Sequence, residues 1–370
     1  MTSPIRVLQV FTILNRGGAE TMVMNYYRHM DRSKVQFDFL VCRPERGAYE
    51  DEIETMGGRI YRVPPVFKPF AHLACVRKFL CEHPEYQIIH GHIGELGYFI
   101  YKEARARGVP CIIAHAHSNF CDKDWKLPLR YILKLLIRKQ VTHSMACGVS
   151  AAQWYFGKEN AKHAIILNNA IESDKYRFSQ HEYGQVRQEQ GWEGRWVIGN
   201  VSRFSPPKNH VFLVDVFSEI VKEKSNALLV LIGKTEGAEY KKVYRQVQKL
   251  GLSGSVIFLG SRDDVSYLLK GMDVFCFPSL YEGFGIAMLE AEASGLHVVK
   301  STQVPNDAVV VPDLVTSLPL NAPMSQWKEE LTQSHPRRDT YADICLAGFD
   351  IAENAQWLQQ FYLDQVYTIE

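Results

Sequence analysis

Two cations lie close together in a loop that follows the apolar run Trp196–Val201. Arg203 and Lys208 stand five positions apart, and Pro206 and Pro207 stiffen the loop between them. An arginine can fork onto phosphate oxygens, while a lysine supplies a compact point charge. The pair therefore suits the two negative charges of a pyrophosphate and lessens the need for a divalent metal. Taken alone, the loop is explained better by two solvated cations.

The segment from 277 to 291 carries the most informative pattern. A buried strand ends there, and a loop with two glycines leads into a helix. Glu282 lies in this loop, where its carboxylate can accept hydrogen bonds from hydroxyls, and Glu290 lies about a turn and a half into the helix. Backbone N–H groups at the helix start can meet phosphate or sugar oxygens, and these belong to Gly283, Phe284 and Gly285. The pattern matches a nucleotide sugar; a salt-bridged helix carboxylate is the alternative for Glu290.

A second glycine-containing loop follows the first apolar run of the chain. Gly17 and Gly18 lie in Asn15–Glu20, which connects a predicted strand to a helix. Paired glycines let the backbone approach a ligand, and the helix start offers N–H groups to an anion. The loop does not have the sequence G-x-G-x-x-G, which weakens the hypothesis that it binds a nicotinamide or flavin dinucleotide. A plain turn that needs positive φ explains the glycines equally well.

Four histidines form two His-x-His pairs after predicted strands, at His90 and His92 and at His115 and His117. Residues i and i+2 of a strand share a face, so each pair can project together. Imidazole suits zinc or iron. However, no carboxylate or cysteine completes a recognisable ligand set, and we predict no metal.

The elements that position these residues follow from the alternation of short apolar runs with amphipathic segments. Strands are predicted in the first half at Arg6–Thr12, Gln36–Val41, Arg59–Val63, Gln87–His90, Cys111–His115, His143–Cys147 and Ala164–Leu167, and in the second half at Trp196–Val201, Ala227–Ile232, Val256–Leu259, Val274–Phe277 and His297–Val299. Helices are predicted at Glu20–Met30, Phe70–Glu82, Leu96–Arg107, Leu129–Val141, His210–Glu223, Tyr240–Leu250, Val265–Leu269, Ile286–Ala293 and Asp350–Gln365.

Strands separated by helices imply parallel sheets covered on both faces, and their number favours two sheets. A chain of 370 residues is also long enough for two domains. We expect the join in the polar stretch Ser173–Gly194. Ligands of such sheets bind beyond the carboxyl ends of the strands, which is where the charged loops lie.

Charge and composition exclude several classes of protein. The net charge of +1 gives no overall field that would attract nucleic acid. Eight cysteines without a C-x-x-C pair favour buried, reduced thiols in a cytosolic protein over disulfides or zinc. No apolar run reaches the roughly 20 residues of a transmembrane helix. We therefore expect a protein that is soluble or lies on a membrane surface.

A basic amphipathic segment, Lys123–Lys139, carries six cations among apolar residues. Such a helix can rest on an anionic membrane with its cationic side chains reaching the headgroups. An ordinary amphipathic helix that packs on the sheet is the other interpretation.

Taken together, the motifs resemble those of retaining GT-B glycosyltransferases of family 4, in particular bacterial exopolysaccharide and capsule enzymes. The resemblance spans nearly the whole chain. It rests on Gly17-Gly18-Ala19-Glu20, the Arg203…Lys208 loop and Glu282-x7-Glu290, with further likeness at Ala146–Ser150, Leu167–Ile171 and Val256–Gly260.

The resemblance implies an α/β fold of two Rossmann-like domains with parallel sheets facing across a cleft. It implies an N-terminal, acceptor-side domain over 1–175, a C-terminal, nucleotide-sugar-binding domain over 176–350 and a last helix, 351–370, that returns to the first domain. The reaction would transfer a sugar from a nucleoside diphosphate to a glycan or a lipid-linked acceptor. UDP is the nucleotide that we expect first, and the reaction would not require a metal. The enzyme would work in the cytoplasm or on the inner face of its membrane.

The implied roles are specific to residues. Arg203 and Lys208 would hold the diphosphate, Glu282 would contact sugar hydroxyls and Glu290 the ribose. Further donor contacts would come from Gly17 and Gly18, from the backbone around Arg262 and from Gly283, Phe284 and Gly285, while His117 would face the sugar and acceptor.

Some positions depart from the family pattern. Gly233–Gly237 stands where the family often has a glycine-acid-glycine turn, and Asn169 stands where it usually has a glycine. His297 takes the place of a common proline, and Val304–Asp307 takes the place of a common acidic residue. The nucleotide, sugar and acceptor therefore stay open. A GT-B sugar-nucleotide epimerase and an inactive nucleotide-sugar-binding partner subunit are the alternatives.

Overall fold

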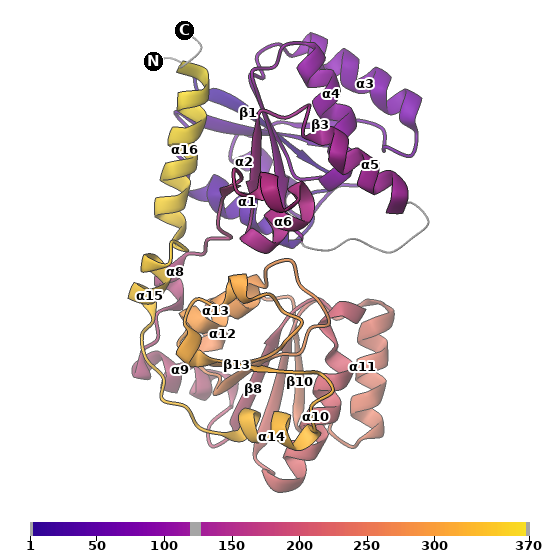
Figure 1. The fold of residues 1–370 in the computed structure, drawn as a ribbon. Helices are drawn as coiled ribbons and strands as arrows, with labels where there is room; N and C mark the ends of the chain where they lie inside the picture. The colour runs from indigo at the N-terminus through magenta and orange to yellow at the C-terminus, as the bar shows by residue number, and fades with distance from the viewer. Residues whose placement is uncertain (1–2, 119–126, 368–370) are drawn as a thin grey trace. The chain divides into compact units, whose positions relative to one another are not determined.

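The structure of the chain is a computed structural model that describes residues 3–118 and 127–367. It consists of two compact units. The first comprises Met1–Ile171 together with Asp350–Glu370, and the second comprises Glu172–Phe349. Each unit is an α/β structure built on its own parallel sheet (Figure 1).

The first unit has a seven-stranded sheet in the order β3-β2-β1-β4-β5-β6-β7, and every pairing is parallel. Its strands are β1 (Ile5–Phe11), β2 (Val35–Val41), β3 (Ile60–Arg62), β4 (Ile88–Gly91), β5 (Cys111–Ala116), β6 (His143–Ala146) and β7 (Ile165–Ile166). All seven residues of β2 are buried, as expected for a strand that helices cover on both faces.

The helices of the first unit cover its sheet (Figure 1). They are α1 (Gly18–His29), α2 (Glu50–Thr55), α3 (Pro69–Glu82), α4 (Tyr98–Ala106), α5 (Leu127–Ile137), α6 (Val149–Phe156), α7 (Lys158–Ala161) and α16 (Ile351–Tyr367), with a 3₁₀ turn at Gly94–Gly97. The last helix belongs to this unit because Ala355, Leu358 and Tyr362 are buried in one core with Val7 and Phe37.

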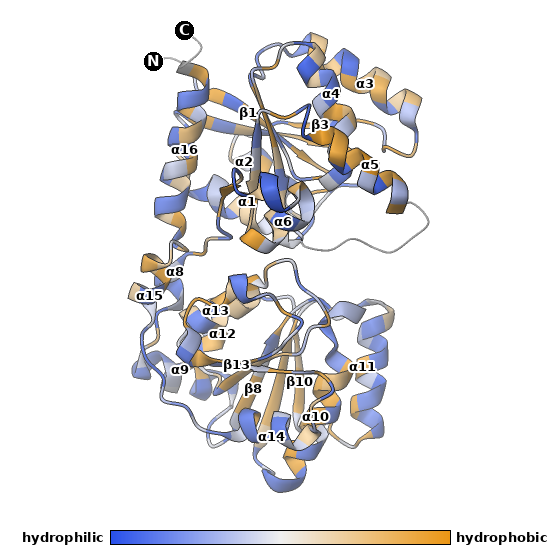
Figure 2. Cartoon of the chain, viewed as in Figure 1, coloured by the Kyte–Doolittle hydropathy of each residue, from blue (hydrophilic) through white to orange (hydrophobic). Residues whose placement is uncertain are grey.

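The second unit has a six-stranded sheet in the order β10-β9-β8-β11-β12-β13, again wholly parallel. Its strands are β8 (Trp196–Val201), β9 (Ala227–Ile232), β10 (Val256–Gly260), β11 (Val274–Phe277), β12 (His297–Ser301) and β13 (Val315–Leu318). Figure 2 shows the strands as an apolar interior beneath helices whose outer faces are polar.

The helices of the second unit are α8 (Ser173–Tyr176), α9 (Gln180–Gln190), α10 (His210–Glu223), α11 (Gly237–Lys249), α12 (Val265–Lys270), α13 (Ile286–Ala293), α14 (Met324–Thr332) and α15 (Tyr341–Leu346). Short 3₁₀ turns lie at Pro206–Lys208, Asn306–Ala308 and Pro312–Leu314.

The predicted fold class, two parallel sheets in Rossmann-like units, is confirmed. The polar stretch where we expect the join is not a linker without structure, because it carries α8 and α9 of the second unit. Helix α9 begins where the Ser179 hydroxyl accepts a hydrogen bond from the N–H of Glu182, and it ends at Gly191 in the left-handed region. Buried Arg187 anchors it to Asp273 at 3.0 Å.

Both sheets contain a point where the strand order changes direction. In the first unit β1 lies between β2 and β4, and in the second unit β8 lies between β9 and β11. Loops that leave neighbouring strands at such a point diverge and open a place for a ligand. The loops after β8 and β11 are those that hold Arg203, Lys208 and Glu282.

Two expectations need correction. The cysteines are not uniformly buried: Cys81 is exposed and Cys75 and Cys345 are half-buried, although the other described cysteines are buried and all of those described are free. Not every described cation of the basic segment can reach lipid headgroups, because Lys134 is buried against the Trp154 ring and donates a hydrogen bond to the Trp154 carbonyl at 2.6 Å. The first part of that segment, 123–126, lies outside the described residues.

Among the residues that the structure describes, no helix combines the length and apolar character required to cross a bilayer.

Candidate functional site

The loops after β8 and β11 are joined by backbone contacts. The N–H of Leu280 donates to the carbonyl of Pro207 at 2.7 Å. The side-chain amide of Asn209 donates to the carbonyl of Pro278 at 3.2 Å. Asn209 has φ of 56°, a left-handed conformation that asparagine tolerates better than most residues. These contacts hold the proline-containing turn after β8 against the segment that carries Glu282.

Lys208 and Glu282 form an ion pair across these two loops. Lys208 Nζ lies 2.5 Å from Glu282 Oε1, and the side chains are 19% and 10% exposed. The hydroxyl of Ser279 donates to the same carboxylate oxygen at 2.7 Å. The ammonium also lies 5.3 Å from the centre of the Phe277 ring. The lysine is therefore held beside the carboxyl end of β11, with water partly excluded.

Two buried serines, Ser279 and Ser301, hold the loop that carries Glu282 in place. Ser279 is buried, and its carbonyl accepts a hydrogen bond of 2.5 Å from the hydroxyl of buried Ser301. The sequence analysis did not predict a role for Ser279. Its position could have indicated one, because it lies two residues after β11 and three before Glu282, from where a hydroxyl can reach the carboxylate.

Arg203 does not join this pair. It is exposed and follows β8 by two residues. Its backbone position is set by a buried network in which Asn200 donates to the carbonyl of Cys276 at 2.8 Å and receives a bond of 2.7 Å from Ser202. His210 contacts the Ser202 hydroxyl at 3.0 Å. The structure thus presents the arginine on a fixed strand end with its guanidinium open to solvent.

Glu290 is the fifth residue of α13, and its carboxylate accepts a hydrogen bond from the hydroxyl of Tyr176 at 2.8 Å. Burial raises its pKa to about 7, and the Tyr176 hydrogen bond opposes that rise. In the described part of the chain Glu290 has no cationic partner, so the salt-bridge alternative is wrong. Tyr176 is a second residue that the sequence did not indicate, since it lies 114 positions away.

The start of α13 is built for close approach. Gly285 precedes the helix with φ of 101°, which strains any other residue. A Cβ at this position would also lie 3.3 Å from the Phe277 ring. The first N–H groups of a helix lack partners within it, and together with the helix dipole they favour an anion. Phe284 is buried and packs on Phe349 at 5.6 Å, so the loop has an apolar anchor.

Arg262 lies apart from these groups. It follows β10, the edge strand, which is separated from β8 by β9. Its guanidinium forks onto Asp264 with contacts of 2.7 and 2.5 Å. The guanidinium is therefore engaged within its own segment, and the donor contact that the resemblance implies for the backbone here stays a prediction.

In the first unit, Gly17 and Gly18 precede and open α1. Neither has positive φ, so the alternative that a turn requires these glycines is wrong. A Cβ at Gly18 would meet nothing within 4 Å, and one at Gly17 would meet the flexible end of Glu20. The backbone at the start of α1 therefore carries no side chain at Gly17 or Gly18 that would keep a ligand away from its N–H groups.

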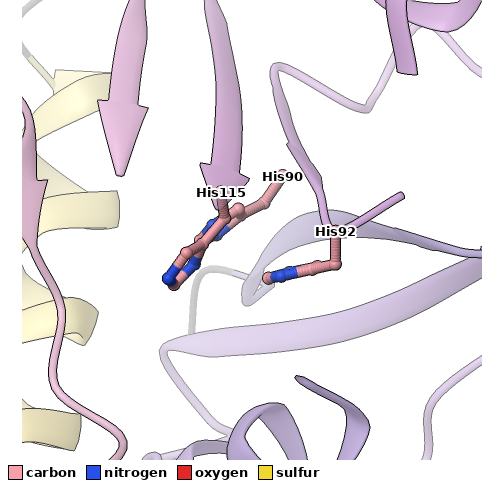
Figure 3. Close-up of side chains that lie close together, drawn as sticks. All are labelled: His90, His92 and His115. Atoms are coloured by element: carbon pink, nitrogen blue, oxygen red, sulfur yellow. The ribbon is translucent and has the colours of Figure 1, made fainter. Parts of the chain in front are cut away.

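The four histidines of the first unit come together as the strand periodicity predicts. The rings of His90 and His92 are 4.4 Å apart, and those of His115 and His117 are 4.1 Å apart. Burial lowers the pKa of His117 to about 3, so its ring is neutral near pH 7. Figure 3 shows His92 pointing toward the overlapping rings of His90 and His115, whose ligating atoms and its own lie within 4.8 Å of one another.

Comparison with known proteins decides the family. A family model for group 1 glycosyl transferases matches residues 184–328, and a model for the glycosyl transferase 4-like domain matches residues 17–154. The putative glycosyltransferase EpsF of Bacillus subtilis is 33% identical over 98% of this chain and 97% of its own length. The chain belongs to the group 1 glycosyltransferases. It is therefore an enzyme that transfers glycosyl groups, and the two sheets are those of the GT-B fold.

Two further similarities bear on this glycosyltransferase. The capsular polysaccharide biosynthesis glycosyltransferase CapH of Staphylococcus aureus is 25% identical over 98% of this chain and 99% of its own. The crystal structure of HepE from Anabaena in complex with UDP-glucose matches with a TM-score of 0.72 over 98% of this chain and 96% of that one, at 20% identity. The latter likeness concerns the fold.

Proposed function

We propose that the enzyme transfers a sugar from a UDP-sugar to a hydroxyl of a bacterial surface glycan, with retention of the anomeric configuration. The observation that carries the proposal is the Lys208–Glu282 pair beside the start of α13, with exposed Arg203 on the neighbouring loop. A fixed cation, a free guanidinium and a helix start supply the positive groups that a diphosphate needs.

The donor identity rests on chemistry and on likeness. HepE, which shares the fold, was crystallised with UDP-glucose. Arg203 and Lys208 oppose the charge that grows on the leaving diphosphate, a task that other enzymes give to a divalent metal. The proposed reaction therefore needs no metal at this site.

The other donor contacts divide between sugar and nucleoside. Glu282 accepts hydrogen bonds from sugar hydroxyls, and Glu290 accepts them from the ribose. The backbone contributes N–H groups at Gly283, Phe284 and Gly285 and around Arg262, and Gly17 and Gly18 of the first unit approach the diphosphate.

The proposed chemistry is a front-face displacement. The bond from the anomeric carbon to the diphosphate oxygen breaks, the acceptor oxygen bonds to that carbon from the same face, and the acceptor proton passes to the leaving phosphate. The proposal assigns Glu282 and Glu290 to donor binding, so neither acts as the nucleophile or the acid that a carboxylate pair supplies in glycoside hydrolysis. Neutral His117 stabilises the positive charge that builds on the sugar.

We infer that the acceptor is a growing glycan, carried on a lipid. CapH, a relative over nearly the whole chain, is named for capsular polysaccharide biosynthesis. Helix α5 presents exposed Leu129, Ile132 and Leu135, 55%, 54% and 60% exposed, close to exposed Arg138 and Lys139. Apolar and cationic groups in that combination suit an anionic bilayer, which would place the enzyme on the inner face of the cytoplasmic membrane.

An NMR time course tests the reaction. UDP-glucose, UDP-galactose and their N-acetyl forms are followed with enzyme alone and with a lipid-linked oligosaccharide. The proposal expects UDP release that depends on the acceptor and a product with the donor's anomeric configuration. Epimerised donor without acceptor would instead establish an epimerase, and nucleotide binding without any turnover of these or GDP- and ADP-sugars would establish a partner subunit.

A further inference from the structure

Among the described residues of the first unit, an unbranched chain of hydrogen bonds crosses the core. It connects β1, β4, β5 and the last helix, α16, although these segments lie far apart in the sequence. Its members, in order, are His117, His92, Gln9, Tyr362, His90 and His115. One end is the histidine that we assign to the reacting sugar, so the chain's direction bears on the state of that ring.

Gln9 sets the direction because its two polar ends have different chemistry. Its carbonyl oxygen, Oε1, lies 2.8 Å from His92 Nε2 and can only accept a hydrogen bond. His92 therefore carries its proton on Nε2, and its neutral ring has a lone pair on Nδ1. That lone pair accepts from His117 Nε2 at 2.7 Å. His117 is thus protonated on Nε2, and Nδ1 is its unprotonated nitrogen.

The other end of Gln9 fixes the second half of the chain. Its amide nitrogen donates to the Tyr362 oxygen at 3.4 Å, so the phenol proton is free to go to His90 Nδ1 at 2.6 Å. His90 then donates from Nε2 to His115 Nδ1 at 3.1 Å. All donors point the same way, and the chain ends at His115 Nε2, which has no partner among the described residues.

Protonation does not disturb this order near pH 7. Burial lowers the pKa of His90 to about 3 and moves the pKa values of His92 and His115 well below their usual range. The neighbouring histidines lower the pKa of these three further. Each imidazole is therefore neutral, and the remaining choice for each ring is which nitrogen carries the single proton.

We propose that Gln9 and Tyr362 are positioning residues that hold His117 in the Nε2–H tautomer, leaving the Nδ1 lone pair for the positive charge that grows on the donor sugar. The inference rests on the proposed function of His117. It gives α16 a part in the reaction, since this helix supplies the tyrosine that orients Gln9. A ring held in the opposite tautomer would present an N–H to the developing cation and oppose it.

The same histidines offer a rival use as metal ligands. Ligating nitrogens of His90, His92 and His115 lie within 4.8 Å of one another, and imidazole suits zinc. However, both ring nitrogens of His90 and of His92 are engaged in the chain. A metal would have to displace those hydrogen bonds, so the tautomer chain accounts for the contacts better.

The test reads tautomers directly on the full-length protein. Nitrogen-15 NMR of labelled histidines reports which nitrogen of each ring is protonated, and His117→Gln identifies the resonance of that ring. The variants Gln9→Met and Tyr362→Phe remove polar groups of the chain with little change of shape. Tyr26→Phe is the matched control, because Tyr26 is buried in the same core but donates outside the chain, to the Asn168 carbonyl at 2.7 Å.

We expect the His117 ring to be protonated on Nε2 in the wild type and in Tyr26→Phe, and to become a mixture of tautomers in Gln9→Met and Tyr362→Phe. Turnover should fall about tenfold in the two chain variants, with less than about a twofold change in the donor KM, and not in the control. The same His117 tautomer in all four proteins would overturn the inference. Zinc that binds the wild type and removes the His90 and His92 N–H signals would overturn it too.

His117→Ala separates this inference from the proposed function. Unchanged turnover in that variant would remove His117 from the reaction, whatever the tautomers are. Lost turnover combined with unchanged tautomers in Gln9→Met and Tyr362→Phe would sink the positioning role alone. Because Tyr362→Phe keeps the ring that fills the core, it preserves the test if Gln9→Met does not fold.

Discussion

Lys208 Nζ and Glu282 Oε1 are 2.5 Å apart although 74 positions separate the two residues. The contact exists because β8 and β11 are neighbours in the sheet and each residue follows one of these strands. The pair makes the lysine a fixed charge rather than a solvated one. The predictions below follow from this arrangement and from the groups around it.

Lys208→Ala should lower turnover about 100-fold or more, because it removes a preorganised cation from the leaving diphosphate. It should also lower the free energy of unfolding by about 1–3 kcal/mol, since Glu282 loses a partner while partly buried. Steady-state kinetics and urea unfolding measure the two effects. Lys222→Ala, which breaks an exposed ion pair with Glu219, should change neither. Full activity of Lys208→Ala would contradict the assignment.

Arg203→Ala should separate activity from stability. The side chain is exposed, so the free energy of unfolding should change by less than about 0.5 kcal/mol. Turnover should nevertheless fall about 100-fold, and Arg203→Lys should recover part of it because the charge returns without the fork. Arg245→Ala, an exposed arginine of α11, serves as control. Equal activity of the Arg203 and Arg245 variants would argue against a diphosphate contact.

The buried carboxyl of Glu290 predicts a pH dependence of stability. Its pKa is about 7 in the folded protein and has an ordinary value of 4.5, so the unfolded chain loses this proton first as pH rises. The free energy of unfolding should therefore fall between about pH 4.5 and 7 through this group and level off above. Glu290→Gln should remove that fall. The difference between wild type and variant isolates it from Glu292, whose pKa burial raises to about 8.

The same carboxyl should make donor binding depend on pH. Ribose hydroxyls donate best to the ionised form, so the affinity for UDP-glucose should rise between about pH 6 and 8 and should not rise in Glu290→Gln. Calorimetry with UDP-glucose suits the test because its diphosphate does not titrate in this range. A parallel rise in both proteins would mean that another group is responsible.

Helix α16 should contribute strongly to the stability of the first unit. Leu358→Ala removes a buried side chain from the core that contains Val7 and Phe37, and the cavity should cost about 2–5 kcal/mol. Gln356→Ala on the exposed face of the helix should cost little. Thermal unfolding measures both. Similar melting temperatures for the two variants would show that the helix does not stabilise the fold as its burial indicates.

The sequence predicted the central strands because each is a continuous apolar run that ends in polar residues. β8, β9 and β11 begin and end where we expect, and so do α10 and α13. The edge strand β13 was missed, since its residues are half-buried or exposed and lack the apolar signal. Helix α9 was missed because a cap and the ion pair from Arg187, rather than an apolar face, hold it in place.

The site could be predicted only in part. The strand ends placed Lys208 and Glu282 in the loops where the structure has them. Their contact depends on which strands are neighbours, and single-sequence patterns do not give strand order. The link from Tyr176 to Glu290 has the same origin. Strand periodicity predicted that the histidines of each His-x-His pair share a face. It could not predict the hydrogen-bond chain through Gln9 and Tyr362, because these two residues are 353 positions apart in the sequence.

Calorimetric binding of UDP and UMP tests the central claim most directly, because these ligands differ only in the terminal phosphate that Arg203 and Lys208 are proposed to hold. The wild-type enzyme should bind UDP at least about tenfold more tightly than UMP, and Lys208→Ala should lose most of that preference while its affinity for UMP stays nearly constant. A preference for UDP that is the same in both proteins would contradict the assignment of this loop as the diphosphate site.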